Sequence, residues 1–512
     1  MGASQALQGG MTLQIIDRLR THAQHKPRAE ALRELDGTGR SLTYDQLWAD
    51  VIALAGRIAQ QCPDRPVVLI SFPNQLEFAT AFLAVLSAGG AAFPLHPRLT
   101  DDERRTAARR SGAAGILGTD EAIAAITPLG IVHLSVPAPH MRAAYRGPLA
   151  DSPPGWVDRS DVARLLLQSS GTTGAPKIVE RSGVSLDAVA RNVAASVPLR
   201  PDDHVLGLVP ACHSYGVENV LLGPLWAGCT VQLCQSLDAL LVRGDVCAPP
   251  PTVFPGVPSM FEMLAAAGDP TRTVPPALRR LRRVYSAGAT LPRSVFGAFQ
   301  KRFGLRVGQL YGMTEIGSVT FNDPDEPDHD PDHVGLPMDG VRIRVVDPET
   351  KCIDRPLPPD AEGEVAVSAP SMLTGYLGDD QPVCEAADAM RDGFFLTADL
   401  GRLDGCGRLT ITGRLKLVVD VGGLKVNLLE VEQALSEHEA VEQCAVIPVA
   451  VSATVSRLKA YIIPRNGHGD LSFEELHAFL RPRLSAHKIP RSFECRDSFP
   501  RSPTGKLLRY RL

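Results

Sequence analysis

The feature that most restricts the fold is a repeated alternation of short apolar runs with amphipathic stretches. Residues 66–72 and Arg283–Ser286 are apolar runs of strand length, and they predict buried strands. Residues 295–303 and Leu76–Ser87 lie between such runs and have the spacing of helices. Because strands that alternate with helices form parallel sheets covered on both faces, we predict an α/β fold. Its large N-terminal domain is expected to hold parallel sheets flanked by helices.

The pattern changes after residue 334. Short strands with turns over residues 334–367 predict a β-rich subdomain. After Arg414 a compact mixture of strands and helices predicts a small separate α+β C-terminal domain. A chain of 512 residues is too long for one core, so a division into domains is expected. Residues 1–11 are predicted to be a flexible tail.

Composition and charge argue against several classes of function. The net charge of −4 gives no case for nucleic-acid binding or for attraction to a membrane surface. The ten cysteines include no Cys-x-x-Cys pair and no secretory signal is visible, so reduced thiols and a cytoplasmic location are expected. The most apolar window, residues 79–95, is too short and too interrupted to span a bilayer. The Asp- and His-rich residues 322–333 contain prolines and no regular spacing, which favours a solvated loop over a metal site.

Residues 169–177 form the segment best suited to bind a polyphosphate. They read Ser-Ser-Gly-Thr-Thr-Gly-Ala-Pro-Lys and follow an apolar run. A loop with so little side-chain bulk presents backbone N–H groups and hydroxyls to an anion, and its lysine adds a positive charge. The spacing differs from that of the common P-loop, because two residues separate Gly171 from Gly174 and a proline precedes Lys177.

Further motifs follow downstream. Residues 311–315 (Tyr-Gly-Met-Thr-Glu) offer an aromatic ring for a purine, a hydroxyl for a phosphate oxygen and a carboxylate for Mg²⁺. Asp399 can accept both hydroxyls of a ribose. Arg414 and Lys416 flank one residue at the start of the mildly basic C-terminal part, and Lys506 stands on a Pro/Gly loop near the end of the chain.

In this order the motifs resemble those of the ANL superfamily of adenylate-forming enzymes, which includes acyl- and aryl-CoA synthetases, adenylation domains of peptide synthetases, and luciferases. The resemblance covers nearly the whole chain, from about residue 12 to Leu512. It implies ATP-dependent activation of a carboxylic acid as an acyl adenylate, with release of pyrophosphate, and then transfer to a thiol. The implied cofactors are ATP and Mg²⁺, with CoA or phosphopantetheine as the acceptor.

The resemblance also assigns roles within the motifs. The phosphate loop would hold the β- and γ-phosphates, Tyr311 would stack on adenine, and Asp399 and Arg414 would hold the ribose. Thr314 would contact the α-phosphate, and Glu315 would bind Mg²⁺. The implied ATP-binding set is Ser169, Ser170, Gly171, Thr172, Thr173, Gly174, Lys177, Gly288, Ala289, Tyr311, Asp399 and Arg414.

A mobile C-terminal domain with two arrangements is also implied. The implied division is a large adenylation domain over residues 12–413, a hinge over 414–416 and a small domain over 417–512. Lys416 would be the pivot, and Lys506 would bridge the acid and ATP during adenylation. Gly422 and Gly423 would line the thiol tunnel in the second arrangement. Because attack of a carboxylate on a phosphate brings two anions together, catalysis must come from positioning and from neutralisation of charge.

Four positions depart from the family pattern. Ile178 and Gly183 stand where the family usually has Gly and His after the phosphate loop. Ala398 stands where Gly is common, and Leu417 where an acidic residue often follows the hinge. None of these changes removes a catalytic group. They bear on the geometry of the phosphate loop and therefore on turnover.

The acid is expected to bind near His213, whose context resembles the His beside the acyl pocket of acyl-CoA synthetases. Tyr215 stands about where amino-acid-activating domains place an Asp for the α-ammonium, which disfavours an α-amino acid. Glu218 can serve a displaced amine, so a β-amino acid stays open, although a mostly apolar aryl or acyl acid is favoured. Gly308 is expected to leave room in the pocket. The expected pocket residues are Tyr215, Gly216, Glu218, Asn219, Gly308, Gln309, Leu310 and Met313.

The thiol acceptor and the oligomeric state stay open. No carrier domain follows Lys506, so the expected partners are a small carboxylic acid and either CoA or a separate acyl or peptidyl carrier protein. The alternative is a standalone adenylation enzyme that loads an amino acid, β rather than α, onto a carrier protein in natural-product biosynthesis. A luciferase-type oxygenase would depend on oxygen. A non-catalytic nucleotide sensor would bind ATP without releasing pyrophosphate.

Overall fold

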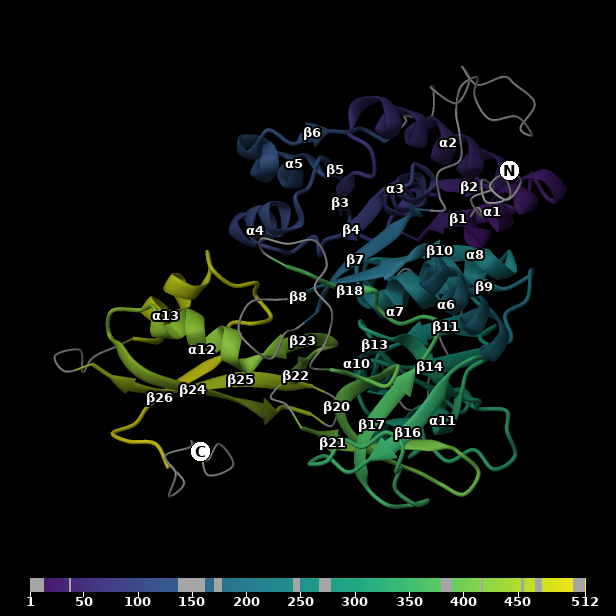
Figure 1. The fold of residues 1–512 in the computed structure, drawn as a ribbon. Coiled ribbons are helices and arrows are strands. Elements are labelled where there is room, and N and C mark those ends of the chain that lie inside the picture. Colours follow the sequence, from purple (N-terminus) through teal and green to yellow (C-terminus); the bar gives the residue numbers. More distant parts are fainter. Residues whose placement is uncertain are drawn as a thin grey trace, which may run out of the picture.

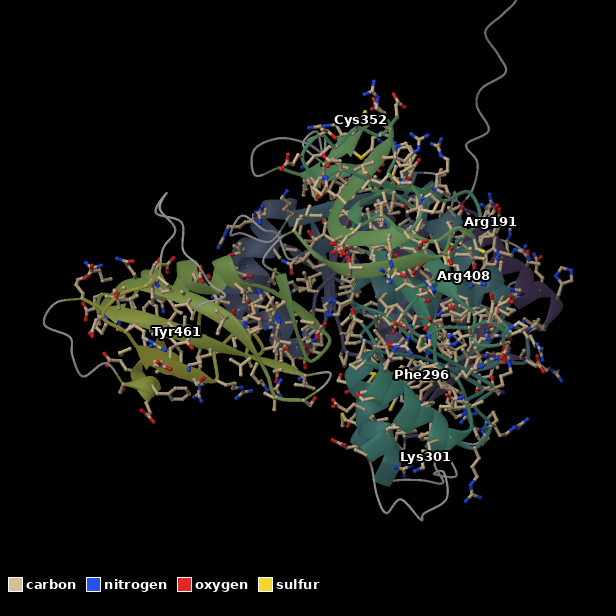
Figure 2. All side chains as sticks on the ribbon, turned by 90° about the horizontal axis from the view of Figure 1, so that it is seen from below. Arg191, Phe296, Lys301, Cys352, Arg408 and Tyr461 are labelled. Atoms are coloured by element: carbon tan, nitrogen blue, oxygen red, sulfur yellow. The ribbon has the colours of Figure 1, made fainter. Side chains whose placement is uncertain are left out.

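The computed structural model describes residues 13–35, 38–136, 162–169, 177–242, 249–266, 278–378, 389–415, 418–452, 455–465, 472–500 and 512. Two large sheets and their helices form the main part, a β-rich sheet adjoins them, and a small C-terminal part lies to one side (Figure 1). Figure 2 shows the same division from below, with Tyr461 in the C-terminal part and Phe296 and Lys301 in the main part. The predicted α/β class is confirmed.

The first large sheet contains seven of the described strands in the order β18-β8-β7-β4-β3-β5-β6. These are β3 (Val67–Ser71), β4 (Ala91–Pro94), β5 (Gly115–Gly118), β6 (Val132–His133), β7 (Arg164–Ser169), β8 (Lys177–Ser182) and β18 (Gly375–Leu377). The strands from β7 to β6 pair in parallel, whereas β7, β8 and β18 pair antiparallel. The helices that precede or join these strands are α2 (Tyr44–Gln61), α3 (Leu76–Ser87), α4 (Asp101–Ser111) and α5 (Asp120–Ile126). Helix α3 is apolar on nearly every side and is therefore buried along most of its length.

The second large sheet has nine strands within the described ranges, in the order β15-β14-β13-β12-β11-β9-β10-β1-β2. These are β1 (Glu30–Glu34), β2 (Ser41–Thr43), β9 (His204–Gly207), β10 (Thr230–Leu233), β11 (Val253–Gly256), β12 (Arg283–Ser286), β13 (Gly308–Met313), β14 (Gly317–Asn322) and β15 (Leu336–Pro337). The helical segments that accompany them are α1 (Gln14–His25), α6 (Gly183–Ser196), α7 (Ser214–Gly216), η4 (Val217–Leu222), α8 (Gly223–Ala227), α9 (Leu237–Val242), α10 (Pro258–Ala266) and α11 (Arg293–Phe303). Because β11, β12 and β13 are parallel, the segments that follow them lie at one edge of the sheet, where ligands bind in open α/β folds.

The predicted β-rich subdomain is present and reaches the end of the large part. Its described strands are β16 (Arg342–Val346), β17 (Gly363–Ser368), β19 (Met390–Arg391), β20 (Phe394–Leu403) and β21 (Leu409–Arg414). They pair antiparallel, and β20 is the strand that joins β17 to β21. This sheet carries the Asp399 motif toward the two large sheets.

The C-terminal part has a core of its own. Its elements are β22 (Val418–Val421), β23 (Leu424–Asn427), α12 (Leu428–Ser436), β24 (Val441–Ala450), β25 (Ser456–Pro464), α13 (Phe473–Leu480) and β26 (Ser492–Cys495). Leu435 of α12, Ile462 of β25 and Leu480 of α13 are fully buried against one another in a cluster separate from those of the main part. The expected α+β character is confirmed.

The Asp- and His-rich segment is held by arginines. Arg283 binds Asp323 and Asp325, and Arg293 binds Asp330 and Asp332. These carboxylates are paired with neighbouring arginines. Among the described helices, none is long and apolar enough to cross a membrane.

Candidate active site

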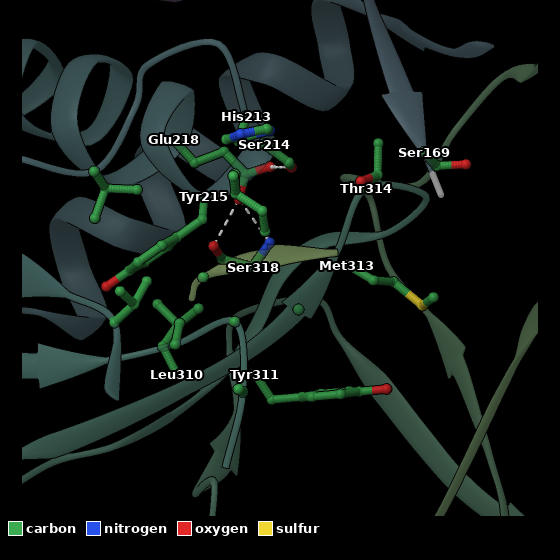
Figure 3. A pocket seen from close by; sticks show the side chains of 18 of the residues that line it. Ser169, His213, Ser214, Tyr215, Glu218, Leu310, Tyr311, Met313, Thr314 and Ser318 are labelled. Atoms are coloured by element: carbon green, nitrogen blue, oxygen red, sulfur yellow. Dashed lines mark hydrogen bonds between the residues drawn. The ribbon is translucent and has the colours of Figure 1, made fainter. Parts of the chain in front are cut away.

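A continuous cavity of about 1470 Å³ is lined by both large sheets, the β-rich sheet and the C-terminal part. Figure 3 shows one region of it, with Tyr311 below and Glu218 above. The cavity brings together residues of each motif that the structure describes. Those that line it are Ser169, Lys177, His213, Tyr215, Glu218, Gly288, Ala289, Gln309, Leu310, Tyr311, Met313, Thr314, Glu315, Asp399, Gly422 and Gly423.

Tyr311 and Asp399 come from different sheets and meet in the cavity. The Tyr311 hydroxyl donates to Oδ2 of Asp399 at 2.8 Å. Asp399 is only 2% exposed. On the neighbouring strands β20 and β21, Asp399 and Arg414 are register partners. An aromatic ring therefore adjoins a buried carboxylate, an arrangement compatible with the predicted contacts to a purine and a ribose. We call Tyr311, Thr314, Glu315 and Asp399 the nucleotide half of the cavity.

The backbone next to Asp399 explains one departure from the family pattern. Ala398 has φ +57°, a left-handed conformation that costs an L-residue about 1 kcal/mol and that glycine adopts freely. The Ala398 N–H donates to Oε1 of Glu364 at 3.1 Å, and its carbonyl accepts the N–H of Leu415 at 2.7 Å. These two hydrogen bonds hold the strained residue in place.

Thr314 and Glu315 form the turn between β13 and β14. Glu315 is 8% exposed, its carbonyl accepts the N–H of Leu373, and its Oε1 accepts the Tyr376 hydroxyl at a long 3.5 Å. Burial raises the pKa of Glu315, while the Ser169 hydroxyl and the Lys177 ammonium act in the opposite direction. A buried carboxylate with such weak donors around it suits a cation such as Mg²⁺.

Ser169 and Lys177 frame the phosphate loop. They are register partners, so the loop joins the ends of an antiparallel pair, β7 and β8. The Lys177 ammonium lies 4.5 Å from the centre of the Tyr376 ring, beside Glu315. The predicted loop residues Ser170, Gly171, Thr172, Thr173 and Gly174 lie outside the described residues.

Two other departures occupy packing positions. Ile178 is 1% exposed and packs in the apolar cluster on one face of the first sheet. Gly183 is the first residue of α6, whose N-terminus is capped by Ser182, because the Ser182 hydroxyl accepts the N–H of Ser185. Neither residue points to a missing catalytic group.

Tyr215 forms a wall of the cavity with its ring. Its hydroxyl donates to the carbonyl of Gly256 at 3.1 Å and lies 3.4 Å from that of Tyr285. Because the Tyr215 hydroxyl is hydrogen-bonded to backbone carbonyls, the ring presents an apolar surface to the cavity. It offers no carboxylate that could pair with a substrate ammonium. We call Ser214, Tyr215, Glu218, Leu310 and Ser318 the acid wall.

Glu218 differs from the expectation that it can serve an amine. Its carboxylate forms an ion pair with Arg181, and the two side chains are 1% and 0% exposed. Ser214 donates to Oε1 at 2.6 Å, and the N–H and hydroxyl of Ser318 donate to Oε2 at 2.8 and 2.6 Å (Figure 3). The carboxylate is already saturated, so it is not available to a substrate amine.

Three expected pocket residues serve packing instead. A Cβ on Gly216 would lie 2.1 Å from the carbonyl oxygen of Pro210, and one on Gly308 would lie 2.9 Å from that of Asn322. The Asn219 amide bonds to Tyr215, Ser318 and Tyr285 and has no exposed surface. None of the three lines the cavity, so the expectation that Gly308 leaves room for substrate is wrong.

His213 belongs to a group of imidazoles that the sequence did not indicate. The rings of His213 and His96 are 5.5 Å apart, and His487 of the C-terminal part lies 6.5 Å from His96. Burial lowers the pKa of His213 to about 4, that of His96 to about 3 and that of His487 to about 4. His96, Cys212 and His213 place a ligand atom each within 4.8 Å of one another. Nδ1 of His96 already accepts the N–H of Arg98, which leaves its proton on Nε2 and makes the ring a poor metal ligand.

Gly422 and Gly423 form the turn of the β22–β23 hairpin. Their φ values are +64° and +87°, as a tight hairpin turn requires. A Cβ on Gly423 would lie 3.3 Å from Val257 of the main part. The hairpin tip therefore reaches the cavity and contacts the segment that follows β11.

A second contact joins the two parts at α4. The Ser485 hydroxyl and N–H both donate to the Glu103 carboxylate, and the Lys488 ammonium lies 3.4 Å from its Oε1. Glu103 also accepts the N–H of Thr100 as part of the capping box of α4. We call this contact of Glu103, Ser485 and Lys488 the interdomain latch.

Several expected residues cannot be placed, and several functional ones were missed. Lys416 and Lys506 lie outside the described residues, and the structure gives no account of the Arg414 side chain. The residues expected from the sequence did not include Arg181, Glu103 or Lys488. No clear signal marked Arg181 in the sequence, because β8 also carries Lys177, Glu180 and Ser182.

Two families of known protein domains match the chain. The AMP-binding enzyme family matches residues 19–377, and the family of its C-terminal domain matches residues 430–506. The chain belongs to the AMP-binding enzymes. It is therefore a member of the ANL adenylate-forming superfamily, as the motifs indicated.

This AMP-binding enzyme is similar to curated ligases and to solved structures. It is 32% identical over 491 residues to a feruloyl-CoA synthase of Amycolatopsis, covering 95% of this chain and 96% of the relative. It is 29% identical to a mitochondrial malonate–CoA ligase of Bos taurus, covering 93% and 87%. An amide bond synthetase from Marinactinospora thermotolerans superimposes with a TM-score of 0.81 at 25% identity over 98% of this chain and 99% of that one. A malonyl-CoA ligase with methylmalonyl-CoA and AMP bound gives 0.76 at 29% identity over 93% and 97%. The chain is thus an AMP-forming acid–thiol ligase.

Proposed function

We propose that this enzyme activates an aryl acid as its acyl adenylate and transfers the acyl group to CoA. The observation that carries the proposal is the shared cavity, which joins the nucleotide half, the acid wall and the Gly422–Gly423 turn. A nucleotide, an acid and a thiol can meet there without leaving the protein. The similarity to a feruloyl-CoA synthase supports an aryl acid.

In the first step a carboxylate oxygen bonds to the α-phosphorus of ATP and pyrophosphate leaves. Tyr311 and Asp399 would fix the nucleoside, and Thr314 would contact the α-phosphate. Bound Mg²⁺ would supply positive charge against the phosphate oxygens, and Glu315 would hold it. Lys177, Lys506 and the phosphate loop would neutralise the remaining charge.

In the second step the thiol bonds to the acyl carbon and AMP leaves. With Gly422 and Gly423 at the cavity and the interdomain latch closed, we propose that the C-terminal part stands in the arrangement for thiol transfer. Residues 414–416 would be the hinge about which it turns to bring in Lys506. The cytoplasm, which supplies ATP and CoA, is the proposed location.

A test of the two arrangements is Lys506→Ala. Adenylate formation, measured by pyrophosphate release, should fall by at least roughly 100-fold, because the variant loses a cation at the reacting carboxylate. Thiolysis of a supplied acyl adenylate should stay within about twofold. Equal loss of both half-reactions would contradict the two-arrangement mechanism.

The acid and the acceptor are tested together. Pyrophosphate release should be measured with aryl, fatty, α-amino and β-amino acids, each with CoA, without CoA and with a phosphopantetheinylated carrier protein. Multiple turnover with an aryl acid and CoA is expected. Stimulation by the carrier alone would favour a standalone loading enzyme. ATP binding without pyrophosphate release from any acid would favour a nucleotide sensor.

A further inference from the structure

The acid wall contains a buried ion pair whose charges cancel. Arg181 lies in β8, and Glu218 lies in the wide helical turn Val217–Leu222. Glu218 lines the cavity, whereas Arg181 lies behind it with no exposed surface. The wall therefore faces the substrate with a carboxylate whose charge is already neutralised from behind.

The other charges around the cavity lie outside the acid wall. Among the described lining residues these are Lys177, Glu315 and Asp399 in the nucleotide half, Lys351 paired with Glu364, Asp332 paired with Arg293, and Arg98, an exposed cation that adds to the effect of burial in lowering the pKa of the neighbouring His487. A charged group on the far end of a substrate would thus enter the acid wall without a partner. The desolvation of an unpaired charge is costly, so such an acid is disfavoured.

The serine hydroxyl groups of the acid wall can still accept hydrogen bonds but cannot donate them to a substrate. Ser214 and Ser318 each donate their only proton to Glu218. The Ser318 oxygen also accepts the amide of Asn219, and Arg181 lies 3.4 Å from the Ser214 oxygen. Each hydroxyl oxygen keeps a lone pair and no proton, so both can accept a hydrogen bond but cannot give one.

We infer that the Arg181–Glu218 pair makes the pocket selective for an acid whose far end is an uncharged hydrogen-bond donor, such as a phenol hydroxyl. A dicarboxylate and an amine-bearing acid are both excluded by the cancelled charge. An ether at the same place finds no donor in Ser214 or Ser318. This inference rests on the proposed acid activation and names the substrate class of the same site.

The first test uses four cinnamic acids that share ring and length and differ at the para position. The substituents are hydroxy, methoxy, carboxy and aminomethyl. The readout is kcat/KM for the acid, from pyrophosphate release and from formation of the CoA thioester. The wild-type protein should favour the hydroxy acid over the methoxy acid by about tenfold and over the two charged acids by more. Equal use of the hydroxy and methoxy acids would overturn the inference.

The second test separates the two charges. Glu218→Gln leaves Arg181 unpaired, so the carboxy acid should gain at least about tenfold relative to the hydroxy acid. Arg181→Met leaves Glu218 unpaired, so the aminomethyl acid should gain by a similar factor. If the pair selects by charge, one variant gains activity with the anionic acid and the other gains activity with the cationic acid. A structural role would lower kcat/KM for all four acids alike, and that result would refute the inference.

Controls keep the result decisive. Arg164 pairs with Glu180 at 3.0 Å on the neighbouring β7–β8 register, away from the cavity. Arg164→Met should leave the order of the four acids unchanged. If both single variants fail to fold, the double variant Arg181→Met/Glu218→Leu restores neutrality and should lose the preference for the hydroxy acid. Retention of that preference would sink the proposal. If the wild-type protein releases no pyrophosphate with any acid, the proposed function itself fails, which is a separate outcome.

Discussion

The two halves of the cavity treat buried charge in opposite ways. In the nucleotide half Glu315 is buried with weak donors, and its pKa is raised. On the acid wall Glu218 is also buried but is saturated by Arg181, Ser214 and Ser318. The comparison teaches that a buried carboxylate with few and weak donors is still able to bind a cation, whereas a buried carboxylate with a full set of donors is not.

The largest effect is expected from removing the charge of Glu315, which tests the contrast between the two carboxylates. Glu315→Gln keeps the shape and removes the charge, so adenylate formation should fall by roughly 100-fold. The dependence of the rate on Mg²⁺ concentration should shift to higher concentration. The matched control is Glu180→Gln, a buried carboxylate in β8 that does not line the cavity. An unchanged Mg²⁺ dependence in Glu315→Gln would show that the two halves do not differ as described.

The next effect concerns the second step alone. Glu103→Gln weakens the interdomain latch, because Lys488 loses one of its two carboxylates. Thioester formation from a supplied acyl adenylate should fall by about tenfold, while pyrophosphate release in the first step stays unchanged. The control Glu437→Gln alters an exposed pair with Arg483 and should change neither. Loss of pyrophosphate release in Glu103→Gln would contradict the proposal that the latch belongs to the arrangement for thiol transfer.

A smaller effect is expected from pH. The imidazoles of His96, His213 and His487 have pKa values lowered to about 3, 4 and 4 by burial, whereas an unfolded His titrates near 6.5. Between pH 6.5 and about 4 the unfolded chain therefore binds more protons than the folded one. The stability should be full above pH 6.5 and should fall as the pH decreases toward 4.

The variant His487→Gln tests that pH dependence. It removes one of the three groups, so its unfolding free energy should depend less steeply on pH over the same interval. Chemical denaturation at a series of pH values measures the slope. The same slope in both proteins would mean that His487 is not buried in the neutral form.

The smallest expected effect is a gain. Ala398→Gly relieves the left-handed backbone beside Asp399 and should raise the free energy of unfolding by up to about 1 kcal/mol, less the added chain entropy of glycine. Nucleotide affinity should stay the same, because Asp399 keeps its bond from Tyr311. Thermal or chemical denaturation and ATP titration are the measurements. A loss of stability would show that the hydrogen bonds of Ala398 relieve the strain fully.

The sequence indicated that Tyr311, Thr314 and Glu315 lie together but did not indicate the Arg181–Glu218 pair, for a physical reason. Tyr311 lies near the end of β13, close to the turn that holds Thr314 and Glu315, so a short motif fixes their relative positions. Arg181, Glu218 and Ser318 come from three separate elements, and only packing brings them together. The role of Gly308 could not be read from the sequence, because a glycine needed for close packing and one that opens a pocket look alike there.

On each side of the interdomain latch, the charged residue has a second partner within its own part of the protein. When Ser485 and Lys488 leave, Glu103 still accepts the N–H of Thr100 as the cap of α4. Lys488 still holds Glu430 at 2.7 Å within its own part. Separation would therefore leave neither ion of the latch without a partner, which lowers the free-energy cost of opening this contact.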